Sequence, residues 1–114
     1  MKRDNRLYLQ DILESIKAID DYTKDLSEGD FKKDMKVQDA VARRIEIIGE
    51  AVKNISDDLK SENSEVPWKD IAGMRDIIAH AYFGVNIKRI WNVLENELPR
   101  LKDQISAVLE NADG

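Results

Sequence analysis

The residues best suited to chemistry lie within one short stretch, residues 75–82, which reads R-D-I-I-A-H-A-Y. His80 is the only histidine of the chain, with Arg75 five positions before it and Tyr82 two positions after it. The imidazole has an ordinary pKa of about 6.5, which suits proton transfer near neutral pH. Arginine offers a planar, permanently charged donor for an anionic group. Any catalytic chemistry of this chain is therefore expected within residues 75–82.

A single straight helix would not bring these side chains to one point. At about 100° per residue, Arg75 and Tyr82 project in nearly the same direction, whereas His80 lies roughly 140° away from Arg75. Convergence therefore requires the helix to unwind near its end or a second subunit to complete the site. Asp76, four residues before His80, has the spacing at which a carboxylate can hydrogen-bond an imidazole and hold its tautomer.

Each of these residues also has a purely structural interpretation. Apart from any family resemblance, a single histidine near a helix end is more often a cap or a surface residue than a catalyst. Arg75 and Asp76 would then be solvated surface charges. The ring of Tyr82 would pack in the core and leave its hydroxyl group at the rim.

A second charged segment spans residues 43–51. Glu46 and Glu50 stand four apart and suggest a carboxylate pair for a metal, but charges beside an apolar seam are usually its solvated edges. Two carboxylates without a histidine on the same helix are a weak metal signal. We therefore expect no metal and no cofactor, and interpret Arg43 and Glu50 as candidate partners of the 75–82 stretch. Gly49, in mid-helix, is expected to permit the close approach of another backbone.

Composition predicts a soluble, single domain spanning residues 1–114, because this length suits one hydrophobic core. No apolar run approaches the ~18 residues of a membrane span, and the N-terminus carries no apolar leader region, so we expect a cytoplasmic protein without membrane contact. The chain has no cysteine, which excludes disulfides. Its net charge of −5 means that binding of nucleic acid would depend on a local basic cleft.

The spacing of apolar residues predicts an all-α fold, an up-down bundle of four to five helices. Residues 6–26 and 34–56 carry apolar positions at three- and four-residue steps, which indicates two long amphipathic helices packed as an antiparallel hairpin. The polar cluster at 27–30 should stop the first helix, after which a short helical turn places Phe31 at the end of the core. Residues 57–66 are polar and are expected to form the longest loop.

The C-terminal half predicts a helix that carries the 75–82 stretch and a kinked last helix. Pro67 is expected in the first turn of the former, Gly84 should end it, and Asn86 should cap the next. Proline removes a backbone donor and clashes with the preceding turn, so Pro99 predicts a kink or a short break. Two aromatic residues are expected in the core or in a dimer interface: Trp68 and Trp91.

The spacing R-x4-H-x-Y of Arg75, His80 and Tyr82 resembles the signature of the HEPN superfamily of metal-independent ribonucleases. It is most similar to the HepT-like toxins, which are paired with a nucleotidyltransferase antitoxin. Further features in the same order extend the resemblance over roughly residues 5 to 110: the 43–51 segment, Val66-Pro67-Trp68, Gly73-Met74-Arg75 and Trp91. The resemblance implies a homodimer that cuts RNA by attack of the 2′-hydroxyl on the adjacent phosphate. Arg75 would stabilise the phosphorane, and two copies of His80 would serve as base and acid.

The resemblance also implies a control point and leaves alternatives open. In this family the transferase neutralises the toxin by adding adenylyl groups to the motif tyrosine, which here is Tyr82. The alternative is a non-catalytic helical module that docks the transferase and binds a nucleotide, with Arg75 on a phosphate and His80 on a base or ribose. Loss of RNA cleavage in His80→Ala would favour the nuclease. A third possibility is a purely structural helical dimer.

Overall fold

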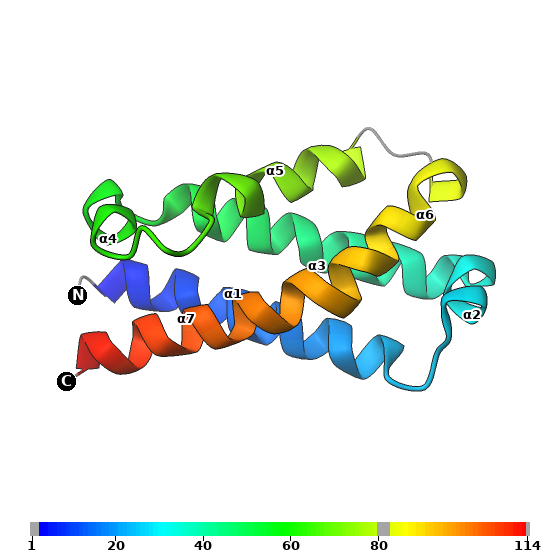
Figure 1. Ribbon diagram of the computed structural model, residues 1–114, viewed down its shortest axis with the longest axis horizontal. Coiled ribbons are helices and arrows are strands. Elements are labelled where there is room, and N and C mark those ends of the chain that lie inside the picture. The colour runs from blue at the N-terminus through cyan, green and yellow to red at the C-terminus, as the bar shows by residue number, and fades with distance from the viewer. Residues whose placement is uncertain (1–2, 80–82, 114) are drawn as a thin grey trace.

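The structure is a computed structural model that describes residues 3–79 and 83–113, and every element in these ranges is helical (Figure 1). The elements in chain order are α1 (Arg3–Thr23), α2 (Glu28–Lys33), α3 (Met35–Asn54), α4 (Asp57–Glu62), α5 (Trp68–Ala79), α6 (Phe83–Asn92), the π-helical segment η1 (Val93–Glu97) and α7 (Leu98–Asp113). The predicted all-α bundle is confirmed. None of these helices is long and apolar enough to cross a bilayer.

The two long helices α1 and α3 pair as the predicted hairpin, and the hairpin is the centre of the bundle. The two helices run side by side, α5 packs on α3, and α7 packs on α1 (Figure 1). Apolar residues at three- and four-residue steps bury one face of each helix, since this spacing repeats once per helical turn. The buried residues of the two facing sides include Leu9, Ile12, Ile16 and Ile19 from α1 and Val41, Ile45, Ile48 and Val52 from α3.

Short helix α2 closes one end of the hairpin and buries Phe31 completely, as predicted. A capping box starts it: Asp30 N–H donates to Ser27 Oγ, and Ser27 N–H donates to the Asp30 carboxylate, both at 3.1 Å. The bond from Ser27 N–H holds the pKa of the Asp30 carboxyl below its ordinary value. The stabilisation from this bond is therefore present near neutral pH and is lost as the pH falls through the lowered pKa. The Phe31 ring lies against Trp91 of α6, with 5.4 Å between centroids.

The prediction of an uninterrupted loop over residues 57–66 is wrong, because α4 occupies more than half of it. Ser56 caps α4, its Oγ accepting a hydrogen bond from Leu59 N–H at 3.3 Å, and Leu59 is buried. The side chain of Asn5 on α1 fixes this cap. Its Nδ2 donates to Ser56 Oγ, and its Oδ1 accepts from Ser56 N–H, both at 3.0 Å. A cap and one buried leucine therefore form a helix too short to show apolar periodicity in the sequence.

The prediction for the junction of α5 and α6 is also wrong. In the described residues α5 ends at Ala79 and α6 begins at Phe83, so Gly84 and Asn86 lie inside the first turn of α6. Gly84 therefore does not end α5, and Asn86 does not cap α6. The preferences of single residues for helix ends are weak, and packing of the apolar face of α6 outweighs them.

Pro99 is accommodated by a π-helical segment, so the predicted kink or break takes a different form. Helices α6, η1 and α7 follow one another without an intervening loop (Figure 1). In a regular α-helix the proline ring would clash with the carbonyl four residues earlier. Over Val93–Glu97 the turn is wider, and Leu98 N–H bonds to the carbonyl of Val93 five residues before it. The wider turn gives the ring space while Leu98 stays fully buried.

Candidate functional site

Helix α5 carries Arg75 and is anchored at its N-terminal end. Pro67 immediately precedes the helix, and its carbonyl accepts a hydrogen bond from Ile71 N–H at 3.0 Å. The sequence predicts Pro67 in the first turn, so its position differs from the prediction by one residue. Trp68 is buried, as predicted, and its indole N–H donates to the carbonyl of Asn63 at 3.0 Å. The helix is thereby fixed against the bundle before the chain reaches Arg75.

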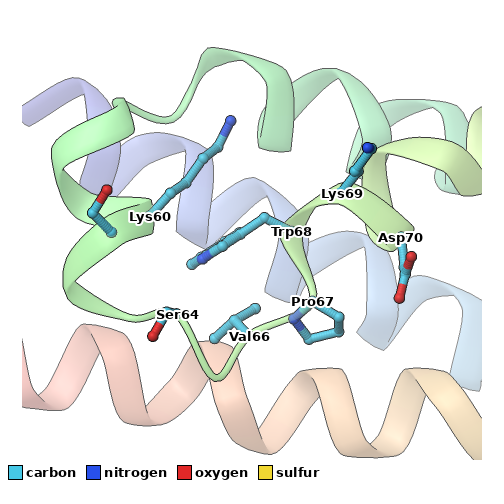
Figure 2. A pocket seen from close by; sticks show the side chains of 8 residues that line it. Lys60, Ser64, Val66, Pro67, Trp68, Lys69 and Asp70 are labelled. Atoms are coloured by element: carbon cyan, nitrogen blue, oxygen red, sulfur yellow. The ribbon is translucent and has the colours of Figure 1, made fainter.

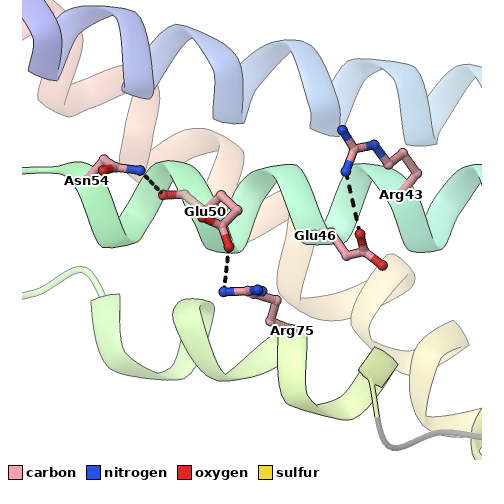
Figure 3. Close-up of polar contacts among 5 residues, drawn as sticks. All are labelled: Arg43, Glu46, Glu50, Asn54 and Arg75. Carbon is pink, nitrogen blue, oxygen red and sulfur yellow. Dashed lines mark hydrogen bonds and ion pairs between the residues drawn. The ribbon is translucent and has the colours of Figure 1, made fainter.

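Arg75 forms an ion pair with Glu50 of α3 (Figure 3). The Nη1 atom of Arg75 lies 2.5 Å from Oε1 of Glu50, and the two side chains are 37% and 53% exposed. At this exposure an ion pair contributes little to stability, because solvent screens the charges. The contact joins the two helices at the position of the guanidinium.

Gly49, next to Glu50 on α3, gives the stem of Arg75 its space. A Cβ atom built on Gly49 would lie 3.2 Å from both Cγ and Cδ of Arg75 and 3.3 Å from its Cβ, closer than ordinary van der Waals contact. The predicted close approach at Gly49 is therefore made by a side-chain stem, where the sequence suggested a backbone. Two successive residues of α3 thus contact Arg75, one along its stem and one at its guanidinium.

The other charged residues of α3 point to separate partners. Arg43 pairs with Glu46 one turn away, at 3.5 Å between Nη1 and Oε2, while Glu50 faces Arg75 (Figure 3). Of the two candidate partners of the 75–82 stretch, Glu50 is in contact with it, and Arg43 pairs within its own helix. The two carboxylates therefore face guanidinium groups and not each other. In residues 3–79 and 83–113 no three metal-ligating side chains come together.

The remaining predicted site residues are placed only in part. Asp76 follows Arg75 on α5 and is exposed. His80 and Tyr82 lie outside the described residues, so the predicted contacts of Asp76 with His80 and of Tyr82 with the core are not tested by the structure.

A groove of about 620 Å³ runs between α5 and the rod formed by α6, η1 and α7. Its lining mixes apolar side chains with two acidic residues, Asp70 and Glu97, and with three cationic residues that the sequence alone did not single out: Lys69, Arg89 and Arg100. These residues are far apart in the sequence, so no local pattern could have grouped them. Gly73 lines the groove from α5, and a Cβ atom built there would meet no other atom within 4 Å. The groove thus has an open floor at Gly73.

A smaller hollow of about 380 Å³ lies where α4 meets the start of α5 (Figure 2). Lys60 and Lys69 stand on either side of the ring of Trp68, and Ser64 lines the hollow beside Val66. It is shallow and lies at the end of α5 away from Arg75.

Comparison with known proteins gives one family. Residues 12–108 match the family described as "Ribonuclease HepT-like". A protein of Methanocaldococcus jannaschii named "Gamma-glutamylcyclotransferase and putative RNase" is 46% identical over 113 residues, which are 99% of this chain and 51% of that protein. A "Probable ribonuclease HepT" of Thermococcus cleftensis is 46% identical over 102 residues, 90% of this chain and 93% of that protein.

A further protein of Methanocaldococcus jannaschii, named "Putative RNase", is 42% identical over 113 residues, 99% of this chain and 93% of that protein. The chain thus spans about half the length of the first of these relatives and nearly the whole length of the other two. No solved structure gives a significant match.

Proposed function

The chain belongs to the family of HepT-like ribonucleases, and from this membership we propose that it is an endoribonuclease that acts without a metal ion. The match over residues 12–108, which includes the R-x4-H-x-Y spacing, carries the proposal. The ion-paired and partly exposed guanidinium of Arg75 supports it, since a phosphate can reach such a group. The proposal treats residues 1–114 as one domain.

In the proposed reaction Arg75 and His80 are the catalytic residues. One His80 removes the proton of the RNA 2′-hydroxyl, and the 2′-oxygen forms a bond to the adjacent phosphorus. The bond from phosphorus to the 5′-oxygen of the next nucleotide breaks, and a second His80 donates a proton to that leaving oxygen. Arg75 binds the phosphorane, whose added negative charge a planar guanidinium stabilises. The products carry a 2′,3′-cyclic phosphate and a 5′-hydroxyl, and Asp76 would hold the tautomer of the imidazole.

The first test is cleavage of RNA in the presence of excess EDTA. We expect the purified protein to cut RNA at the same rate with and without the chelator, because no metal takes part in the proposed reaction. The rate is measured from labelled RNA on denaturing gels. Loss of cleavage in EDTA, restored by a divalent ion, would contradict the proposal and favour a carboxylate site at Glu46 and Glu50.

The use of two His80 side chains requires a homodimer, which is part of the proposal. The sequence predicts an interface that includes the motif helix from Pro67 to Ala81 and part of the helix that carries Trp91. In the described residues, α5 and α6 both border the groove at Gly73. An open groove floor of mixed polar and apolar character suits a packed second copy. Light scattering at micromolar concentration should therefore give twice the chain mass of 13.1 kDa.

Two glycine variants test where the copies meet. Gly73→Glu places a charge on the groove floor and should give a monomer. Gly29→Glu adds the same charge to an exposed position of α2 and should remain dimeric. A monomeric wild-type protein would refute the shared site, and a dimer that persists in Gly73→Glu would refute this interface.

We further propose that the protein is the toxin of a toxin–antitoxin pair and that Tyr82 is its control point. A nucleotidyltransferase partner would attach AMP to the Tyr82 hydroxyl, which brings a negative phosphodiester and a bulky base to a site for RNA phosphate. Co-expression with the cognate transferase should add about 329 Da per AMP, the mass of adenylate less water, and suppress cleavage. Tyr82→Phe should show no mass gain.

Peptide mapping provides the control for this prediction. Tyr22 on α1 is 38% exposed and is a competing acceptor by accessibility alone. A label on Tyr22 or Tyr8, or a labelled protein that cuts RNA at the unmodified rate, would refute the assignment to Tyr82.

A further inference from the structure

We propose that Glu50 is a positioning residue for Arg75, and that Gly49 and Glu50 form a seat on α3 which holds the guanidinium where the RNA phosphate arrives. This inference rests on the proposed ribonuclease function and assigns to α3 a role in the reaction. Glu50 would not touch RNA. It would act through the direction that it gives to Arg75.

The contacts along Arg75 support a two-point hold. Gly49 lies against the stem from Cβ to Cδ, where an added methyl group would displace the stem by a few tenths of an ångström, and Glu50 contacts the far end at Nη1. An unrestrained arginine stem has several rotatable bonds and samples many directions. Contacts at both ends select one direction before the substrate binds, which is the geometric requirement for a donor that must meet a developing charge.

The ion pair leaves the guanidinium available for a phosphate. The contact with Glu50 is made through Nη1, and a guanidinium has five N–H donors in a planar fork. The side chain of Arg75 keeps 37% of its surface exposed. A carboxylate on one side can therefore fix the group while other N–H donors bind phosphate oxygens.

The Glu50–Arg75 ion pair is expected to contribute little to the stability of the fold, so loss of activity in a Glu50 variant would not be explained by unfolding. Both side chains are too exposed for the pair to contribute much to folding. The nearby Arg43–Glu46 pair is also exposed, but both of its residues lie on α3, whereas the Glu50–Arg75 pair joins α3 to α5 (Figure 3). Glu46 thus offers a matched control, a carboxylate of α3 that neutralises an arginine outside the site.

Kinetics of matched glutamine variants give the first test. Glu50→Gln should lower kcat by about 10–100-fold with little change in KM or Tm, because a misdirected donor loses contact mainly with the transition state. Glu46→Gln should match the wild-type protein. Gly49→Ala should lower kcat in the same direction, with a Tm equal to or above that of the wild type, because alanine favours the helix but crowds the Arg75 stem.

Chemical rescue tests whether Glu50 acts through the guanidinium. Added guanidinium ion should restore part of the cleavage lost in Arg75→Ala, because Glu50 can bind the ion where the side-chain group stood. The double variant Glu50→Gln, Arg75→Ala should need about 2–5-fold more guanidinium for the same rate. Equal rescue in both backgrounds would overturn the positioning role.

A readout without RNA keeps this inference separate from the proposed function. In NMR spectra of the wild-type protein, rotation of the Arg75 guanidinium should be slow, and in Glu50→Gln it should be fast. If the wild-type protein cuts no RNA, the ribonuclease proposal is refuted, but the rotation rate of the Arg75 guanidinium still tests whether Gly49 and Glu50 hold it. Wild-type kcat in Glu50→Gln, a raised kcat, or equally fast rotation in both proteins would overturn the role of Glu50.

Discussion

Replacement of Arg75 or His80 by alanine should lower the rate of RNA cleavage by about 10²–10⁴-fold in each case, because one removes the phosphorane donor and the other the proton-transfer group. The free energy of unfolding should change by less than about 1 kcal/mol in Arg75→Ala, since the ion pair that it breaks is half exposed. Single-turnover cleavage of labelled RNA and thermal melts of the same preparations measure both quantities.

The matched control is Arg43→Ala. This variant removes the same charge from an arginine whose side chain is 71% exposed on α3, and it should cleave RNA at the wild-type rate. Cleavage that survives in Arg75→Ala, or that falls equally in Arg43→Ala, would contradict the assignment of Arg75. If the wild-type protein cuts no RNA while it binds a nucleotide, the non-catalytic module is the better account.

Replacement of Phe31 by alanine should lower the free energy of unfolding by about 3–5 kcal/mol, the largest stability loss expected for a single change. Phe31 is fully buried at the end of the α1–α3 hairpin, and its ring packs against Trp91. Its loss would leave a cavity and release the short helix α2, in which no other residue is buried. Urea denaturation followed by circular dichroism measures the change.

Two further variants calibrate this loss. Phe31→Leu keeps most of the buried volume and should lose about 1–2 kcal/mol. Met35→Ala removes a neighbouring side chain that is 73% exposed and should change stability by less than about 0.5 kcal/mol. A loss in Phe31→Ala no larger than that in Met35→Ala would show that Phe31 does not hold the end of the core.

The elements that the sequence predicts well are those with long apolar periodicity. The hairpin of α1 and α3 shows it over several turns, so both helices and their pairing follow from spacing alone. Phe31 is predicted because an isolated aromatic residue follows a polar cluster between two amphipathic segments. In both cases burial of an apolar face decides the structure, and the sequence displays that face directly.

The elements that the sequence predicts poorly depend on contacts between residues that are far apart in the chain. The cap of α4 needs Asn5, which lies at the start of α1 and 51 residues earlier in the sequence, and no pattern within residues 57–66 records that contact. The π-helical turn before Pro99 lets the chain continue from α6 to α7 with its apolar face still buried. The local rule that proline kinks or breaks a helix does not predict this outcome.

The same limit applies to the candidate site. The R-x4-H-x-Y spacing identifies Arg75, and the position of Glu50 on α3 suggests a partner, because both are visible as local patterns. The contact of Gly49 with the Arg75 stem depends on how closely α5 crosses α3, so the sequence predicts a close approach there without its partner. The grouping of Lys69, Arg89 and Arg100 around one groove likewise appears only in three dimensions.

Identification of the RNA ends after cleavage in EDTA tests the central claim most directly. Mass spectrometry of the fragments should show a 2′,3′-cyclic phosphate on one product and a 5′-hydroxyl on the other for the wild-type protein, and about 10²–10⁴-fold slower formation of these fragments for Arg75→Ala or His80→Ala. These ends follow from attack by the 2′-hydroxyl with no water or metal-bound hydroxide in the step. Products with a 5′-phosphate and a free 3′-hydroxyl, or cyclic ends formed equally well by Arg75→Ala, would contradict the account.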